Sequence, residues 1–181
     1  QVEGYVAIIR QLKQSFATLK IYVDGITASD GKTQKVAADE TICAQIREAF
    51  MDSQNIDIIS LIGRDYRTKI CYCDTIDLFI ANAGTGCLVP LRFVKKPGVL
   101  HSNTRLFGFP DDYPTTVQRT RKKFTSDKQV GKRADKDYIS YHIPWEHIFN
   151  LAAEILRQTK NVNIRLLDVP PVAEVAKSYE A

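Results

Sequence analysis

Gly84, Thr85 and Gly86 form a small-residue turn between two apolar segments of this chain. Glycine leaves the backbone N–H groups of a turn uncovered, and Thr85 adds a hydroxyl. Where such a turn leads from a strand into a helix, its N–H groups can bind a phosphate or another anion. The sequence has neither the lysine of a Walker loop nor the third glycine of a dinucleotide-binding loop. The turn therefore predicts an anion site, and the alternative is a tight turn that needs glycine only for its backbone.

Other polar side chains follow the segments that we expect to be strands. They are Asp24, Arg64, Asp65, Asn82, His101, Ser102 and Asn103. A carboxylate such as Asp24 or Asp65 can bind a sugar hydroxyl or act as a general base, and His101 can orient a phosphate or a hydroxyl. Arg64 can contact a phosphate or a base edge. The structural alternatives are turn chemistry for Asp24, a helix N-cap for Asp65 and a hydrogen-bonded core histidine for His101.

Apolar periodicity predicts the elements that position these residues. We expect helices over 2–18, 40–52 (capped by Asp39), 65–75, 84–93 and 145–159, and strands over 20–23, 56–62, 78–81 and 97–100. Alternation of strand and helix is typical of an α/β fold, here a Rossmann-like, mainly parallel sheet with helices on both faces. Because ligands bind beyond the carboxyl ends of parallel strands, the polar loops should converge on one edge.

The domain organisation follows from length and from breaks in this pattern. We predict a single domain over 1–181, an insertion or lid over 104–137 and a tail over 160–181. Basic residues gather in the stretch 119–133. This stretch suits a solvated loop, with peripheral membrane contact or an anionic lipid-linked acceptor as the alternative. It lacks the interleaved aromatic residues of a single-strand channel, so no nucleic-acid partner is expected.

Composition narrows the class of protein further. The chain has 44% hydrophobic and 25% charged residues and a net charge of +4, which is ordinary for a globular domain, and it has no long apolar run. The four cysteines have the spacing of neither a zinc site nor a disulfide framework, so we expect reduced thiols in a cytoplasmic protein, with membrane association left open: Cys43, Cys71, Cys73 and Cys87. No metal site, cofactor or hydrolase nucleophile elbow is expected.

Residues 77–103 resemble the donor-binding motif of glycosyltransferases with two facing Rossmann-like domains, the GT-B fold. Asp77, Gly84, Thr85 and Pro97 fall at matching places in the peptidoglycan N-acetylglucosaminyltransferase family. Capsule and lipopolysaccharide glycosyltransferases, including Kdo- and fucosyl-type enzymes, are the alternative relatives. The first family carries a helix glutamate that holds the donor ribose, where this chain has Pro90, so the ribose contact here must come from another residue.

The resemblance implies the C-terminal, nucleotide-sugar-binding half of a metal-independent glycosyltransferase of surface-polysaccharide or glycolipid synthesis. It places the donor diphosphate on Gly84, Thr85 and Gly86, near Arg64 and His101, with Asn82, Ser102 and Asn103 as further substrate contacts and Asp24 or Asp65 on sugar hydroxyls. The acceptor would be a glycan or lipid-linked sugar, and a separate N-terminal domain would supply the base. The alternative is a non-catalytic Rossmann-like module that binds a nucleotide or a protein.

Overall fold

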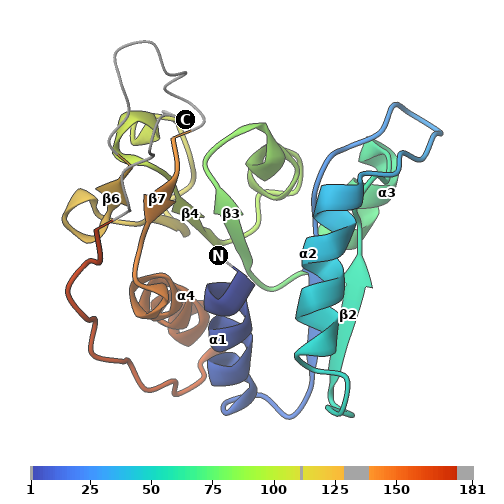
Figure 1. Ribbon diagram of the computed structural model, residues 1–181. Coiled ribbons are helices and arrows are strands. Elements are labelled where there is room, and N and C mark those ends of the chain that lie inside the picture. The colour runs from blue at the N-terminus through green and yellow to red at the C-terminus, as the bar shows by residue number, and fades with distance from the viewer. Residues whose placement is uncertain (1, 111, 129–138, 175–181) are drawn as a thin grey trace, which may run out of the picture.

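The computed structural model describes residues 2–110, 112–128 and 139–174 (Figure 1). Its helices are α1 (Val2–Lys13), α2 (Ala37–Glu48), α3 (Tyr66–Cys73) and α4 (Trp145–Lys160), with short 3-10 turns η1 (Thr85–Cys87), η3 (Thr104–Leu106) and η4 (Lys122–Phe124) and a π-helical turn η2 (Val89–Phe93). Its strands are β1 (Leu19–Val23), β2 (Ile56–Ser60), β3 (Phe79–Asn82), β4 (Gly98–His101), β5 (Val117–Arg119), β6 (Ser126–Asp127) and β7 (Tyr141–His142). The predicted α/β class is confirmed.

The strands pair mainly in parallel. β1 pairs with β2, and β3, β4 and β5 form a second parallel sheet in that order. β6 and β7 form a separate antiparallel pair. The register sets Asn82 opposite His101 and Leu100 opposite Arg119, so the carboxyl ends of β3, β4 and β5 lie at one edge. This edge carries most of the polar residues that the sequence singled out.

Both faces of the β3–β5 sheet are covered, as neighbouring residues of β4 indicate. Val99 belongs to a core cluster with α4 and α1, whereas Leu100 packs with Cys87 and Leu91 of η1 and η2 on the opposite face. Because successive strand residues point to opposite faces, fully buried Val99 and Leu100 require cover on both sides. The strand is therefore held between α4 and the η1–η2 segment.

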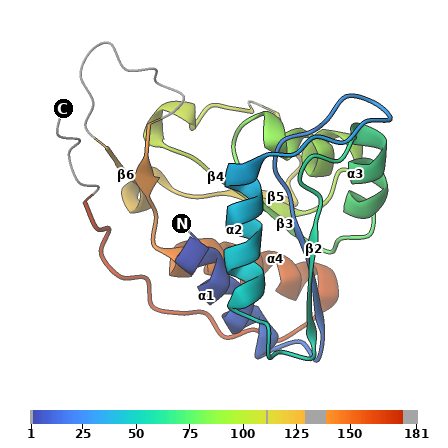
Figure 2. The same cartoon turned by 45° about the vertical axis from the view of Figure 1, so that its right-hand side comes forward.

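The β1–β2 pair is packed in a similar way. Ile21 and Ile58 contact a cluster formed by α1 and α2, and Tyr22 meets Tyr72 of α3 on the other face. Figure 1 shows α1 between α4 and α2, and Figure 2 shows α2 alongside β2 from a second direction. Because α1 contributes to both clusters, it joins the packing of the two sheets.

Two local expectations were wrong. Residues 84–93 do not form one regular helix but the turns η1 and η2, in which Pro90 interrupts the regular pattern of N–H donors. Asp39 does not cap α2, because the helix begins earlier with Val36 as its N-cap residue and no capping side chain. The Asp39 carboxylate instead accepts a hydrogen bond from the backbone N–H of Ile26 at 3.1 Å.

The segment 104–137, expected as an insertion or lid, contributes β5 to the parallel sheet. A three-residue strand among turns gives little periodic signal, so the sequence did not reveal it. Residues 129–137 of the segment lie outside the described part of the chain. Within the described ranges, no helix has the length and apolar character needed to cross a membrane.

Candidate functional site

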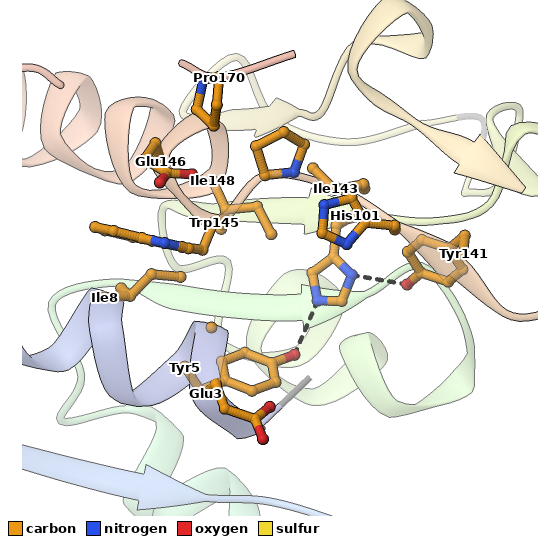
Figure 3. Close-up of a pocket in the computed structure, with 13 residues that line it drawn as sticks. Glu3, Tyr5, Ile8, His101, Tyr141, Ile143, Trp145, Glu146, Ile148 and Pro170 are labelled. Carbon is orange, nitrogen blue, oxygen red and sulfur yellow. Dashed lines mark hydrogen bonds between the residues drawn. The ribbon is translucent and has the colours of Figure 1, made fainter. Parts of the chain in front are cut away.

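A hydrogen-bonded chain of aromatic and polar side chains lies at the carboxyl edge of β3 and β4 (Figure 3). His101 is at the end of β4, and its imidazole Nε2 lies 2.9 Å from the hydroxyl of Tyr5 in α1. Its Nδ1 lies 2.8 Å from the hydroxyl of Tyr141 in β7. Asn82, at the end of β3, donates from Nδ2 to the same Tyr141 hydroxyl at 2.9 Å. Three segments far apart in the sequence thus meet at one imidazole.

Burial sets the protonation states in this chain. It lowers the pKa of His101 to about 4, so the imidazole is neutral at physiological pH. Burial also raises the pKa of Tyr5 to about 12 and raises the pKa of Tyr141, with the nearby tyrosine and Asp127 adding to the second shift. All three groups are therefore uncharged hydrogen-bonding groups. A neutral His101 therefore has no positive charge with which to attract a phosphate.

A cavity of about 480 Å³ opens beside this chain. Its wall combines the start of α1, the end of β4, the segment from β7 into α4, and one proline from the C-terminal part of the chain. The lining residues are Glu3, Gly4, Tyr5, Ile8, His101, Tyr141, His142, Ile143, Pro144, Trp145, Glu146, Ile148 and Pro170. The volume lies within the range of small-molecule sites.

The turn after β3 has open space where side chains would normally be. A Cβ atom built on Gly86 would have no neighbour within 4 Å, and one on Gly84 would touch only the Asn82 side chain at 3.8 Å. Gly84 has a φ of −171°, an extended value open to any residue. The fold therefore does not require glycine at either position. Within the described residues, the backbone N–H groups of Gly84, Thr85 and Gly86 make no hydrogen bond.

Asp24, a candidate base, forms an ion pair with Lys69, which lies 45 positions further along the chain and in no shared motif. The ammonium of Lys69, whose side chain is fully buried, lies 2.5 Å from its carboxylate. The same ammonium donates to the backbone oxygens of Gly25 at 2.7 Å and Ile26 at 3.0 Å, and to the Thr27 hydroxyl at 3.0 Å. Burial raises the pKa of Asp24 and outweighs the opposite effect of Lys69. The pair fixes the loop after β1.

Asp65 is a helix N-cap, which is the structural alternative that its sequence context offered. Its carboxylate caps α3 by accepting from the Thr68 N–H at 2.8 Å, and it also accepts from the Gly31 N–H at 2.8 Å. These hydrogen bonds hold the pKa of Asp65 below its usual range. Arg64 precedes it with an exposed side chain. Asp24, Arg64 and Asp65 lie at the edge of β1 and β2, and no described hydrogen bond or ion pair joins them to the His101 network.

The residues after His101 are buried. Asn103 accepts from the N–H groups of Arg105 and Leu106 at 3.0 Å and so caps η3. The hydroxyls of Ser102 and Thr120, at the ends of β4 and β5, are buried without a hydrogen-bond partner among the described residues. Asn103 is thus explained by local structure, whereas no described hydrogen bond explains the buried hydroxyls of Ser102 and Thr120.

The basic stretch 119–133 is only partly available for partners. Arg119 donates to the backbone oxygens of Leu106 at 3.1 Å and Phe109 at 2.5 Å, so its guanidinium holds the preceding loop. The ammonium groups of Lys122 and Lys123 lie over aromatic rings at 5.6 and 4.9 Å. Lys132 and Arg133 lie outside the described residues.

Sequence reasoning missed Tyr5, Tyr141, Trp145 and Lys69. The tyrosines had no motif, and Lys69 lies on a short helix where lysine normally faces solvent. Comparisons with known proteins add no assignment, because no family model, no curated protein and no solved structure matches this chain.

Proposed function

We propose that this chain binds a nucleotide sugar at the carboxyl edge of β3 and β4, as the donor-binding half of a GT-B glycosyltransferase. The fold that we infer is Rossmann-like. The acceptor would be a glycan or a lipid-linked sugar. An acceptor with negative charge would be attracted by the exposed ammonium groups of Lys122 and Lys123. The base would come from another domain.

One observation carries the proposal: the three successive N–H groups of Gly84, Thr85 and Gly86 make no hydrogen bond within the described residues, and the fold needs glycine at neither Gly84 nor Gly86. Missing side chains at such positions leave room for a ligand to approach the backbone closely. A diphosphate has the charge and acceptor oxygens that uncovered N–H groups bind. In a glycosyl transfer, the same donors would stabilise the negative charge of the leaving diphosphate. The absence of a regular helix at 84–93 means that close backbone contact, rather than a helix dipole, supports this site.

The three candidate catalytic residues are occupied in other roles. Asp24 pairs with Lys69, Asp65 caps α3, and both nitrogens of His101 bond tyrosines. This arrangement supports a chain that binds donor without itself supplying the general base. It equally favours the second candidate, a non-catalytic module that binds a nucleotide or a protein, and the two functions differ in whether a sugar on the nucleotide improves binding.

Calorimetric titration with UDP-, GDP-, CMP- and ADP-sugars and with the free nucleotides tests the proposal. We expect one nucleotide class to bind, its sugar form more tightly than the free nucleotide. Gly84→Asp should weaken binding at least tenfold, because a carboxylate would repel the diphosphate. Gly108→Asp is the matched control, since a Cβ at that exposed glycine has no neighbour within 4 Å. No binding at millimolar ligand, or equal loss in both variants, contradicts the proposal. Equal affinity for nucleotide and nucleotide sugar favours the non-catalytic module.

A further inference from the structure

We infer that the cavity beside Tyr5, His101, Tyr141 and Trp145 binds a neutral sugar ring with vicinal hydroxyls. The inference rests on the proposed function, because it assigns the sugar part of the same ligand, either the ribose or the transferred sugar, to this cavity.

The wall of the cavity is suited to a ligand without negative charge. It contains the carboxylates of Glu3 and Glu146, and neither lysine nor arginine is among the described residues that line it. His101 is neutral because burial lowers its pKa to about 4. Among the described lining residues, a phosphate would meet two carboxylates and no lysine or arginine, so its binding is disfavoured. Hydroxyl groups, in contrast, can donate to a carboxylate.

A count of protons shows that one tyrosine hydroxyl keeps its proton for a further partner. The neutral imidazole of His101 carries one N–H, and its two ring nitrogens bond the hydroxyls of Tyr5 and Tyr141. One of these bonds uses the imidazole proton, and the other uses a tyrosine proton. Tyr141 also accepts from Asn82, which consumes no tyrosine proton. In either tautomer, one tyrosine O–H therefore remains as a donor, and both tyrosines line the cavity.

Glu146 and Trp145 complete the recognition of a sugar. Glu146 makes no hydrogen bond or ion pair with the described residues, so its carboxylate can accept from two adjacent hydroxyls. Trp145 is half-buried, and together with the aliphatic side chains of Ile8 and Ile148 it gives the cavity an apolar side (Figure 3). A sugar ring has the same two-sided character, with C–H groups on its faces and hydroxyls at its rim. The ligand is thus a vicinal-diol ring rather than a fully apolar molecule.

Asn82 connects the cavity to the turn that we assign to the diphosphate. Its side chain donates to Tyr141 at the cavity, and Gly84 lies two positions further along the chain. A single ligand with a phosphate group next to a sugar ring could therefore contact both places. This arrangement separates charge recognition at the turn from hydroxyl recognition in the cavity.

Trp145 is the single tryptophan of the chain, so its fluorescence reports directly on the cavity. The purified chain is titrated with uridine, guanosine, cytidine and adenosine, with methyl glycosides of glucose and N-acetylglucosamine, and with inorganic pyrophosphate. We expect at least one ring with a vicinal diol to change the emission, and pyrophosphate to leave it unchanged. A response to a nucleoside that is lost with its 2′-deoxy form identifies ribose as the ring, whereas a response to a glycoside identifies the transferred sugar.

Two variants test the residues that we assign. Glu146→Gln and Tyr141→Phe should each weaken binding about tenfold, because each loses one hydrogen-bonding function and keeps its shape. Their controls are Glu154→Gln on the same helix and Tyr72→Phe, both away from the cavity lining, which should bind like the wild type. Unchanged affinity in both test variants overturns the inference, as does unchanged emission with every diol ring at millimolar concentration.

The outcome also separates this inference from the donor proposal. If Gly84→Asp abolishes nucleotide-sugar binding while Trp145 emission never changes, the diphosphate site stands and the cavity assignment is wrong. If diol rings change the emission but no nucleotide sugar depends on Gly84, the cavity binds sugar and the donor proposal fails.

Discussion

The ammonium of Lys69 lies 2.5 Å from the carboxylate of Asp24, and solvent does not reach the lysine side chain. The ion pair connects α3 to the loop after β1. Backbone oxygens of Gly25 and Ile26 take further hydrogen bonds from the same ammonium, so a charge that would be costly to bury is fully compensated. The carboxylate at the end of β1 thus serves the fold.

Replacing Lys69 with methionine should destabilise the protein by about 3 kcal/mol, since it leaves Asp24 and two carbonyl groups without their partner. The measurement is the free energy of unfolding in urea. Lys32→Met is the control, because Lys32 is exposed and should change stability by less than about 0.5 kcal/mol. Similar stability of the two variants would contradict the structural role of the pair.

Stability should fall on mild acidification because of His101 and His147. Burial lowers the pKa of both to about 4, and for His147 the charges of Arg121 and Lys123 add to the effect. The unfolded chain, with a histidine pKa near 6.5, binds protons first as the pH falls, so stability is greatest above pH 6.5 and decreases toward pH 4. Each histidine should contribute about 2 kcal/mol of this loss by pH 5.

Urea unfolding at several pH values between about 5 and 7 measures this dependence. A variant such as His147→Gln should show a smaller decrease across that range than the wild type. Protonation of His147 would break a specific hydrogen bond. The Nε2 of His147 accepts from the Arg121 N–H at 3.1 Å, which requires that this nitrogen carry no proton. A pH-independent free energy of unfolding across this window would refute the assignment.

Gly63 and Gly31 offer a comparison of backbone strain with steric collision. Both have positive φ, +66° and +68°, which costs a residue with a side chain about 1–2 kcal/mol. A Cβ on Gly63 would lie 1.7 Å from the backbone oxygen of Gln34, whereas one on Gly31 has no neighbour within 4 Å. We expect Gly63→Ala to destabilise by more than about 3 kcal/mol and Gly31→Ala by about 1 kcal/mol. Thermal unfolding of the two variants checks this order, and equal effects would mean that Gly63 does not pack as described.

Arg119 should matter for the preceding loop rather than for a surface partner. Arg119→Gln removes guanidinium hydrogen bonds to the carbonyl groups of Leu106 and Phe109, and should lower stability by about 1–3 kcal/mol. Limited proteolysis should then cut faster within residues 104–110. Arg121→Gln, at an exposed side chain two positions later, should leave both measurements unchanged. Equal cleavage of the two variants would argue against the anchoring role of Arg119.

The sequence predicted the regular elements well where they have a clear period. The apolar spacing of α1 and α4 and the short apolar runs of β1 to β4 indicated these elements within a few residues, and Asp65 was recognised as a possible helix cap. Prediction was wrong at 84–93, where apolar residues have helical spacing but Pro90 cannot donate to a regular helix. It also missed β5, whose three residues are too few to show a period.

Local sequence was enough to predict the α/β class and to place Asn82, Gly84 and His101 at or just after the ends of strands, because hydrophobic period and turn chemistry are local properties. The partners of these residues, in contrast, depend on tertiary packing. The partners of His101 come from positions 5 and 141, and the partner of Asp24 comes from position 69. Such pairings depend on how the strands and helices pack together, and no local pattern encodes them. Burial, which sets the protonation state of His101 and encloses Lys69, is likewise a property of the packed chain.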